Sequence, residues 1–379
     1  MNNGGRIQSI DLMRGFAVIA MVMGHSIDSV LSNASRGTEL FRLYDAVRGC
    51  TAPVFLFVSG MAFMVVTERK WDTYRAFTPE LGKRIQKILL LYVVGYALHF
   101  PFFSFKKLIY GATPGDLVNL YQVDVLHCVA ASLLVLQAVL FLTRTPRALA
   151  LVAGAVTGII VLLTPLVWMV DVASTISPVA APYFNQQQVS IFPLFPFAGF
   201  LLVGAVAGHL FLSARWQGKE QRFGAAMLVA GIVAGVLGIV LDLLPVAIYP
   251  PHDYWKTSPE FFLVRLSIIL LLTGGVFCLR RIPLYLSGPV IHLGKASLLV
   301  YVAHLVAVYG SAANNGFAQT IGRTFTYPQA VALGLLVLCA MILLERLWNV
   351  VRSRHMVPLR IAQATFVSTL LFFFLTKPY

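Results

Sequence analysis

Residues 9–31 read SIDLMRGFAVIAMVMGHSIDSVL. The run is mostly apolar, and it is long enough for a membrane-spanning helix, which needs about 20 such residues. Arg6, Asp11 and Arg14 stand where a cleavable signal would have its apolar core, and no small-residue cleavage site follows. We therefore predict that this segment stays in the membrane as the first transmembrane helix.

Ten further stretches have the same character, and the composition of the whole chain agrees with them. Hydrophobic residues make up 58% of the 379 residues and charged residues only 12%, whereas soluble domains carry about 25% charged residues. The sequence predicts an all-α, polytopic transmembrane bundle of about 11 helices. The ten further spans are 50–67, 85–104, 123–142, 148–169, 191–213, 224–248, 259–279, 288–312, 327–347 and 358–376.

The net charge of +14 does not indicate a nucleic-acid-binding protein, because the basic residues lie in short clusters between apolar runs. With the N-terminus in the cytoplasm, 18 lysines and arginines fall on the inner side and 8 on the outer side, leaving aside Arg14, Arg265 and Lys295 within helices. Positive charge concentrates on the cytoplasmic side of membrane proteins. We therefore predict a cytoplasmic N-terminus and a multi-pass protein.

The connections are too short to contain a further domain. The longest are 32–49, 68–84, 105–122 and 170–190. The segment FPLFPF (192–197) predicts a kinked helix end, which is tolerated in a membrane where neighbouring helices cover the freed backbone groups.

Ionisable residues inside spans cost about 2.5–3.5 kcal/mol each on insertion scales, so each is a candidate functional group. On the first helix Asp11, Arg14, His25 and Asp28 fall within one stripe about 100° wide. Asp11 and Arg14 lie at the cytoplasmic end, and His25 lies about 21 Å further along. An ion pair between Asp11 and Arg14 and a histidine bonded to a carbonyl are the simpler structural alternatives.

The ninth span repeats this arrangement. His292 and Lys295 lie at its inner end, and Ser297, Tyr301 and His304 follow outward on one face. Packing polar groups between helices is the alternative role for Tyr301 and His304.

With this topology, six ionisable residues come near the outer leaflet. A metal site is one interpretation of three histidines and two carboxylates, but the usual metal-ligand spacings are absent and we expect no metal. Acid–base chemistry fits better, since histidine titrates near neutrality and a carboxylate can fix its tautomer. The predicted catalytic set is His25, Asp28, Arg48, Asp124, His127 and His304.

Several segments, in order, resemble a known enzyme family. Residues 6–25, RIQSIDLMRGFAVIAMVMGH, resemble the opening of transmembrane acyltransferases, and Arg14-Gly15 with His25 is similar to the acyltransferase type 3 opening. Residues 51–63, 123–134, 191–208 and 296–309 are closer to the heparan-α-glucosaminide N-acetyltransferase catalytic family and its bacterial relatives. The resemblance predicts an acyltransferase-like core over 1–312, followed by two further helices of the same bundle in 313–379.

The resemblance implies an acyl-CoA-dependent O- or N-acetyltransferase. Such an enzyme takes acetyl-CoA from the cytoplasm and acylates a hydroxyl or amine of a sugar or glycan at the outer face. Asp11, Arg14, Arg84, Lys87 and Lys295 are then candidates at the inner face for binding coenzyme A, whose phosphates favour basic partners. His25 beside Asp28 is the first candidate base, with His127 and His304 as alternatives. Arg48 or Tyr301 is a candidate donor to the carbonyl oxygen.

The sequence also departs from that family. The family's lysosomal enzyme has its catalytic histidine in the loop after the first helix, and here the corresponding loop, 32–49, has no histidine. The long mid-chain lumenal segment of that enzyme is reduced to 170–190, which disfavours heparan sulfate as the acceptor. The localisation predicted is a bacterial inner membrane, and the bundle fits either a monomer or a homodimer.

A transporter or exporter without covalent chemistry is the alternative from another class. Intramembrane charges and kinked spans occur in transporters too. However, the sequence contains no inverted repeat and no pair of broken helices in matching positions.

Overall fold

The computed structural model describes residues 7–100, 102–187, 189–245, 248–279, 284–311, 314–354 and 356–378. These residues are almost entirely helical and form only three isolated β-bridges. The predicted all-α class is therefore confirmed. The predicted boundary between 312 and 313 lies outside the described residues.

Eight helices in the described ranges are long and apolar enough to cross a membrane, or nine if the bent pair α17 and α18 counts as one span. The chain is thus an integral membrane protein, but the predicted number of about 11 is too high. The N-terminal half of α6 (Pro79–Leu98) carries Glu80, Lys83, Arg84 and Lys87, which leaves too short an apolar stretch. The apolar part of α21 (Met356–Thr376) is likewise short.

The chain divides into two compact units. Unit 1 comprises residues 1–13, 49–97 and 121–283, and unit 2 comprises residues 14–48, 98–120 and 284–379. The helices of unit 1 are α4 (Thr51–Arg69), α5 (Trp71–Arg75), most of α6, α9 (Val125–Leu142), α10 (Pro146–Val167), α11 (Val172–Thr175), α12 (Ala181–Phe184), α13 (Leu194–Trp216), α14 (Glu220–Leu243), α15 (Tyr254–Thr257) and α16 (Pro259–Cys278).

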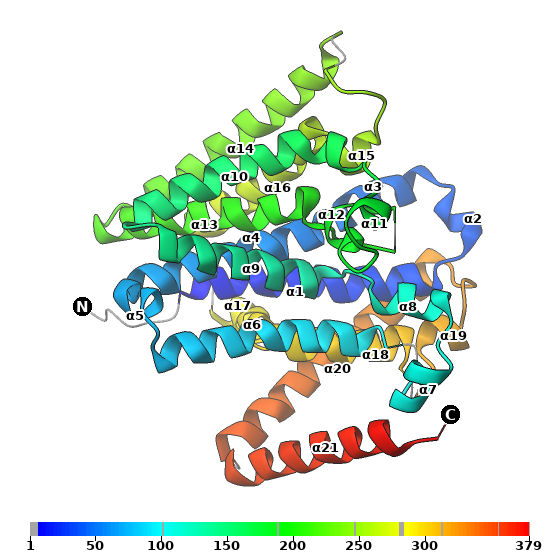
Figure 1. Ribbon diagram of the computed structural model, residues 1–379. Helices are drawn as coiled ribbons and strands as arrows, with labels where there is room; N and C mark the ends of the chain where they lie inside the picture. The colour runs from blue at the N-terminus through cyan, green and yellow to red at the C-terminus, as the bar shows by residue number, and fades with distance from the viewer. Residues whose placement is uncertain are drawn as a thin grey trace. The chain divides into compact units, whose positions relative to one another are not determined.

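Two close helix pairs form the core of unit 1. In Figure 1, α13 lies alongside α4 and α10, and α14 runs beside α16. A β-carbon on Gly60 of α4 would lie 1.8 Å from the Leu201 carbonyl oxygen, and one on Gly204 of α13 would lie 1.9 Å from the Phe57 carbonyl oxygen. Small residues let helix backbones approach closely in membranes, where dispersion contacts replace the hydrophobic driving force. The kink predicted for 192–197 is confirmed, because Phe195 has non-helical backbone angles.

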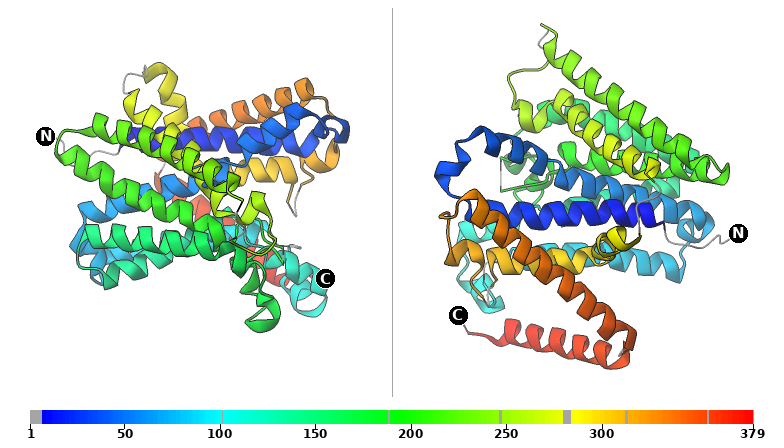
Figure 2. Two further views of the ribbon diagram at one scale, coloured as in Figure 1. Left: turned by 90° about the horizontal axis from the view of Figure 1, so that it is seen from above. Right: turned by 180° about the vertical axis from the view of Figure 1, so that it is seen from behind.

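Unit 2 contains most of α1 (Gln8–Val30) and the C-terminal helices. Its remaining helices are α2 (Asn33–Arg36), α3 (Glu39–Arg48), α7 (Phe105–Tyr110), α8 (Pro114–Leu120), α17 (Leu284–Lys295), α18 (Ser297–Tyr309), α19 (Phe317–Thr320), α20 (Tyr327–Arg354) and α21. Figure 2 shows α20 and α21 meeting at one end, as their packing contacts require. The backbone of Ser32 donates to Phe325, and that of Phe325 donates to Val30, which ties the end of α1 to the segment before α20.

The predicted ninth span is broken. α17 and α18 are bent by 84° at Ala296, so His292 and Lys295 do not continue the face of Tyr301 and His304 as predicted for a straight helix. Lys295 ends α17 and is exposed. A lysine inside a continuous span carries an insertion cost that the break avoids.

The glycine of the Arg14-Gly15 pair has a packing role. A β-carbon on Gly15 would lie 2.0 Å from the carbonyl oxygen of Val290, so α17 crosses α1 at backbone contact. This crossing holds the first half of the broken span against the helix that carries His25.

Candidate functional site

Two histidines from distant parts of the sequence meet in unit 2. His25 Nδ1 of α1 lies 3.3 Å from His304 Nε2 of α18, and their ring centroids are 5.2 Å apart. His304 is fully buried, whereas His25 is partly exposed. The edge of the Tyr309 ring closes on His25 at a centroid distance of 5.7 Å.

The hydrogen bonds of this pair determine its tautomers when both rings are neutral. His304 Nδ1 lies 2.8 Å from the Val300 carbonyl oxygen, and because a carbonyl only accepts, Nδ1 carries the hydrogen. His304 Nε2 then has the lone pair, so His25 Nδ1 must be the donor between the rings. His25 Nε2 is left with a lone pair, which is the form that a general base requires.

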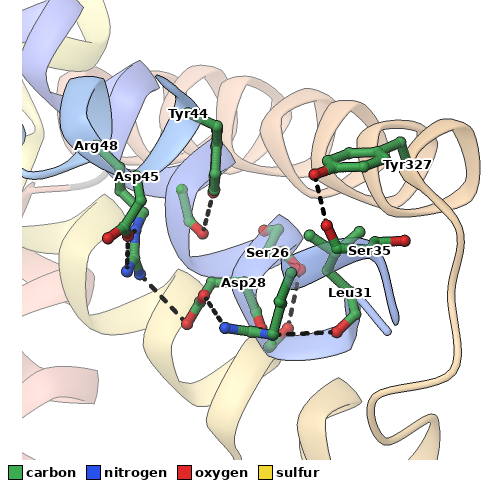
Figure 3. A network of polar contacts seen from close by, with 11 residues as sticks. Ser26, Asp28, Leu31, Ser35, Tyr44, Asp45, Arg48 and Tyr327 are labelled. Atoms are coloured by element: carbon green, nitrogen blue, oxygen red, sulfur yellow. Dashed lines mark hydrogen bonds and ion pairs between the residues drawn. The ribbon is translucent and has the colours of Figure 1, made fainter. Parts of the chain in front are cut away.

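Asp28 lies one turn beyond His25, but its partners are arginines. Its carboxylate is 3.0 Å from Arg36 Nη1 and 3.2 Å from Arg48 Nη1. Arg36 also donates to the backbone oxygens of Asp28 and Leu31, and Arg48 also pairs with Asp45. Figure 3 shows this network of two arginines and two carboxylates at the outer end of α1.

The network fixes Arg48 beside the histidine pair. The aliphatic part of the Arg48 side chain lies over Gly24, where a β-carbon would be 3.3 Å from Cγ. Tyr44, one turn earlier on α3, donates to the Gly24 carbonyl oxygen at 3.0 Å. Two guanidinium groups and two carboxylates balance in charge, which lowers the cost of placing them at a membrane boundary.

Replacement of Asp28 by asparagine is expected to destabilise the protein by about 1–3 kcal/mol, because it leaves both guanidinium groups without their shared carboxylate. The measurement is thermal unfolding in detergent. Glu39→Gln is the matched control on the same segment, since its pair with Arg42 is exposed and such pairs contribute at most about 1 kcal/mol. Equal midpoints for the two variants would contradict this account of Asp28.

The other predicted outer pair, Asp124 and His127, lies in unit 1. Asp124 caps α9, and its carboxylate accepts from His127 Nδ1 at 2.8 Å. The structure thus brings four of the six predicted catalytic residues together in unit 2 and the remaining two together in unit 1.

The predicted inner-face residues are dispersed. Arg84, in unit 1, donates to Thr67 Oγ1 at 3.0 Å and to Gln137 Oε1 at 3.2 Å, with its guanidinium 3.3 Å from the centroid of the Tyr74 ring. Lys87 of α6 is exposed.

On α1, Asp11 is buried and Arg14 is partly exposed; Lys295, at the end of α17, is exposed. Arg14 and Lys295 belong to unit 2, and Asp11 belongs to unit 1.

Sequence reasoning missed Arg36 and two further pairs. Arg36 lies in a connection and counted only toward orientation. The Glu68 carboxylate of α4 accepts from His209 Nδ1 of α13 in unit 1, and Glu345 of α20 lies 3.3 Å from His292 Nδ1 in unit 2. His209 and Glu345 both lie within predicted spans, so the cost of burying an ionisable group was the signal that could have identified them. Within the described ranges, no three histidines, cysteines or carboxylates form a group that could hold a metal ion.

One comparison with known proteins gives a match. The family model described as heparan-alpha-glucosaminide N-acetyltransferase, catalytic, matches residues 6–237. No curated protein matches the chain. The matched part includes His25, Asp28, Arg48 and the Asp124–His127 pair, and it ends before His304.

Proposed function

Because the chain belongs to the heparan-α-glucosaminide N-acetyltransferase catalytic family, we propose that it moves an acetyl group from cytoplasmic acetyl-CoA to a hydroxyl or amine of a sugar or glycan at the outer membrane face. The observation that carries this proposal is the contact between His25 and His304. It supplies a histidine whose tautomer is set by a second buried histidine, as acyl transfer to a weakly acidic nucleophile requires.

In the proposed reaction His25 Nε2 takes the proton of the acceptor hydroxyl or amine. The acceptor oxygen or nitrogen attacks the thioester carbonyl carbon and forms a tetrahedral oxyanion. The carbon–sulfur bond then breaks, and His25 returns the proton to the departing thiolate. His304 holds the His25 ring through Nδ1 and acts as a positioning residue.

The arginine–carboxylate network supplies fixed positive charge next to this base. Arg48 is the proposed donor to the developing oxyanion, because Asp28 and Asp45 hold its guanidinium in one orientation. A donor fixed in advance stabilises charge that develops in the transition state without reorganisation. Asp28 is therefore assigned to orienting Arg48 and Arg36 rather than to His25.

For the donor we propose that Asp11, Arg14, Arg84, Lys87 and Lys295 contribute at the cytoplasmic side, where basic groups favour the phosphates of coenzyme A. Arg14 and the exposed Lys87 and Lys295 are the strongest candidates, because Arg84 is engaged by neutral partners within unit 1. Their charge also fits the cytoplasmic leaflet under the positive-inside rule. We further propose that the membrane is a bacterial inner membrane.

The test of the proposed function uses protein in sealed liposomes with acetyl-CoA on the side of the basic segments and glucosamine on the other. We expect acetylated sugar to accumulate opposite the donor. If glucosamine crosses the membrane unmodified and acetyl-CoA has no effect, the transporter alternative replaces this proposal.

His304 gives a sharper prediction about the positioning role. His304→Ala is expected to lower kcat by about 10- to 100-fold with the Kd for acetyl-CoA unchanged, because His25 loses the acceptor for its Nδ1 hydrogen. His304→Gln is expected to restore part of this loss, since its amide oxygen can accept from His25 while its amide nitrogen donates to Val300. Equal defects in both variants would indicate a role in packing alone. Steady-state kinetics and donor-binding titrations provide the two measurements.

A further inference from the structure

The Asp124–His127 pair in unit 1 is built as a rigid support. One oxygen of Asp124 accepts from His127 Nδ1 at 2.8 Å and from the backbone amides of Leu126 and His127 at 2.8 and 3.2 Å. A carboxylate that caps a helix and bonds its own third residue holds the imidazole in one orientation. Neither side chain has more than 4% of its surface exposed.

The backbone of α6 covers this imidazole. A β-carbon on Gly95 would lie 2.6 Å from His127 Cε1, so the ring rests directly on the helix. The Tyr96 ring meets it edge-on at a centroid distance of 4.3 Å. With no exposed surface on His127, a ligand reaches it only if α6 moves, and the groups that a ligand meets first belong to the tyrosines.

Two phenol hydroxyls pair beside the covered histidine. Tyr96 Oη of α6 and Tyr183 Oη of α12 are 3.0 Å apart, and both side chains are partly exposed. Burial, together with the hydrogen bond to Tyr96, raises the pKa of Tyr183, so its hydroxyl stays protonated. Tyr92, one turn before Tyr96, also faces His127, with a ring-centroid distance of 6.0 Å.

Such a group has the chemistry of a neutral polyol site. Each phenol both donates and accepts a hydrogen bond, which matches a sugar hydroxyl that does the same. The aromatic rings add an apolar surface next to the polar tip. No charge is presented by the phenols themselves, so an anionic donor such as coenzyme A finds no partner in them.

We infer that Tyr96 and Tyr183 form a subsite that binds a hydroxyl-bearing ring of the acceptor, and that Asp124 and His127 position Tyr96 without touching the substrate. This inference rests on the proposed function and assigns its acceptor specificity. It gives His127 a different task from the general base considered in the sequence.

The test compares Tyr96→Phe and Tyr183→Phe with wild type, using acetyl-CoA and methyl β-D-glucosaminide. Each variant loses one hydroxyl, and we expect the acceptor KM to rise about 3- to 10-fold while the KM for acetyl-CoA stays unchanged. Tyr249→Phe is the control, since this tyrosine lies outside the cluster and contacts His252. An unchanged acceptor KM in both cluster variants would overturn the inference.

His127 distinguishes positioning from catalysis. His127→Ala is expected to raise the acceptor KM and to leave the shape of the pH profile of kcat unchanged, with His127→Asn intermediate because its amide can still bond Asp124. A lost limb in the pH profile would make His127 the base and overturn the positioning role.

Failure of the proposed function is separable from failure of this inference. Should wild type not consume acetyl-CoA, binding of methyl β-D-glucosaminide is measured directly by tyrosine fluorescence. Binding that weakens in Tyr183→Phe keeps the subsite, and wild type that does not bind the sugar removes it.

Discussion

Replacement of His25 by alanine is expected to lower kcat for acetyl transfer by about 10²- to 10⁴-fold, the range that a general base contributes. The reason is the tautomer chain, in which Val300 fixes His304 and His304 fixes His25 with its Nε2 lone pair available. Binding of acetyl-CoA is expected to persist, because the proposed phosphate partners lie at the opposite end of α1. Single-turnover transfer and equilibrium donor binding measure the two effects separately.

His252→Ala is the matched control, because this histidine lies in a loop and bonds only to the nearby Pro250 carbonyl oxygen among its described contacts. It is expected to behave as wild type. If His25→Ala retained full turnover, the base would have to be sought elsewhere, and the contact between His25 and His304 would be a packing feature.

The second large effect concerns folding. Gly60→Val is expected to prevent α4 from packing against α13, since even the β-carbon would lie 1.8 Å from the Leu201 carbonyl oxygen and 2.8 Å from its carbon. Backbone atoms cannot rotate away as a side chain does, so the cost should exceed the 1–3 kcal/mol, or about that, of ordinary overpacking. Total stabilities are only about 5–15 kcal/mol. The measurement is recovery of monodisperse protein by size-exclusion chromatography.

Gly158 of α10 offers the matched control, because nothing lies within 4 Å of a β-carbon built there. Gly158→Ala is expected to fold normally and to gain up to about 1 kcal/mol from helix propensity. A Gly60→Val protein with wild-type yield and unfolding temperature would show that α4 and α13 do not pack at backbone distance.

The sequence predicted the helical fold and part of the site for identifiable reasons. Apolar runs of about 20 residues define most spans, and the cost of burying charge singles out His25 and His304. Counting residues along two helices placed both histidines at the same depth, and the structure brings them into contact.

Other features depend on tertiary contacts that periodicity does not encode. Asp28 sits within a turn of His25, which suggested a pair, but the connection after α1 folds back and supplies Arg36 and Arg48 instead. The bend at Ala296 divides a segment that reads as one apolar span. The backbone contacts of Gly60 and Gly204 are visible only when two helices are placed together.

The charge arrangement in unit 2 also explains how an ionisable site is tolerated at a membrane boundary. Asp28 neutralises two arginines at once, and Asp45 takes the remaining charge. The histidine pair needs no counterion while both rings are neutral. The site therefore presents a base and a fixed cation to a substrate without burying an uncompensated charge.

The central claim is covalent transfer from acetyl-CoA, and a product balance tests it most directly. Purified wild-type protein in lipid nanodiscs is mixed with acetyl-CoA and glucosamine, and acetylated sugar and free coenzyme A thiol are both quantified. The account predicts that the two products appear in equal amounts in wild type and that neither accumulates in His25→Ala. Free thiol without acetylated sugar, or neither product in wild type, would contradict it.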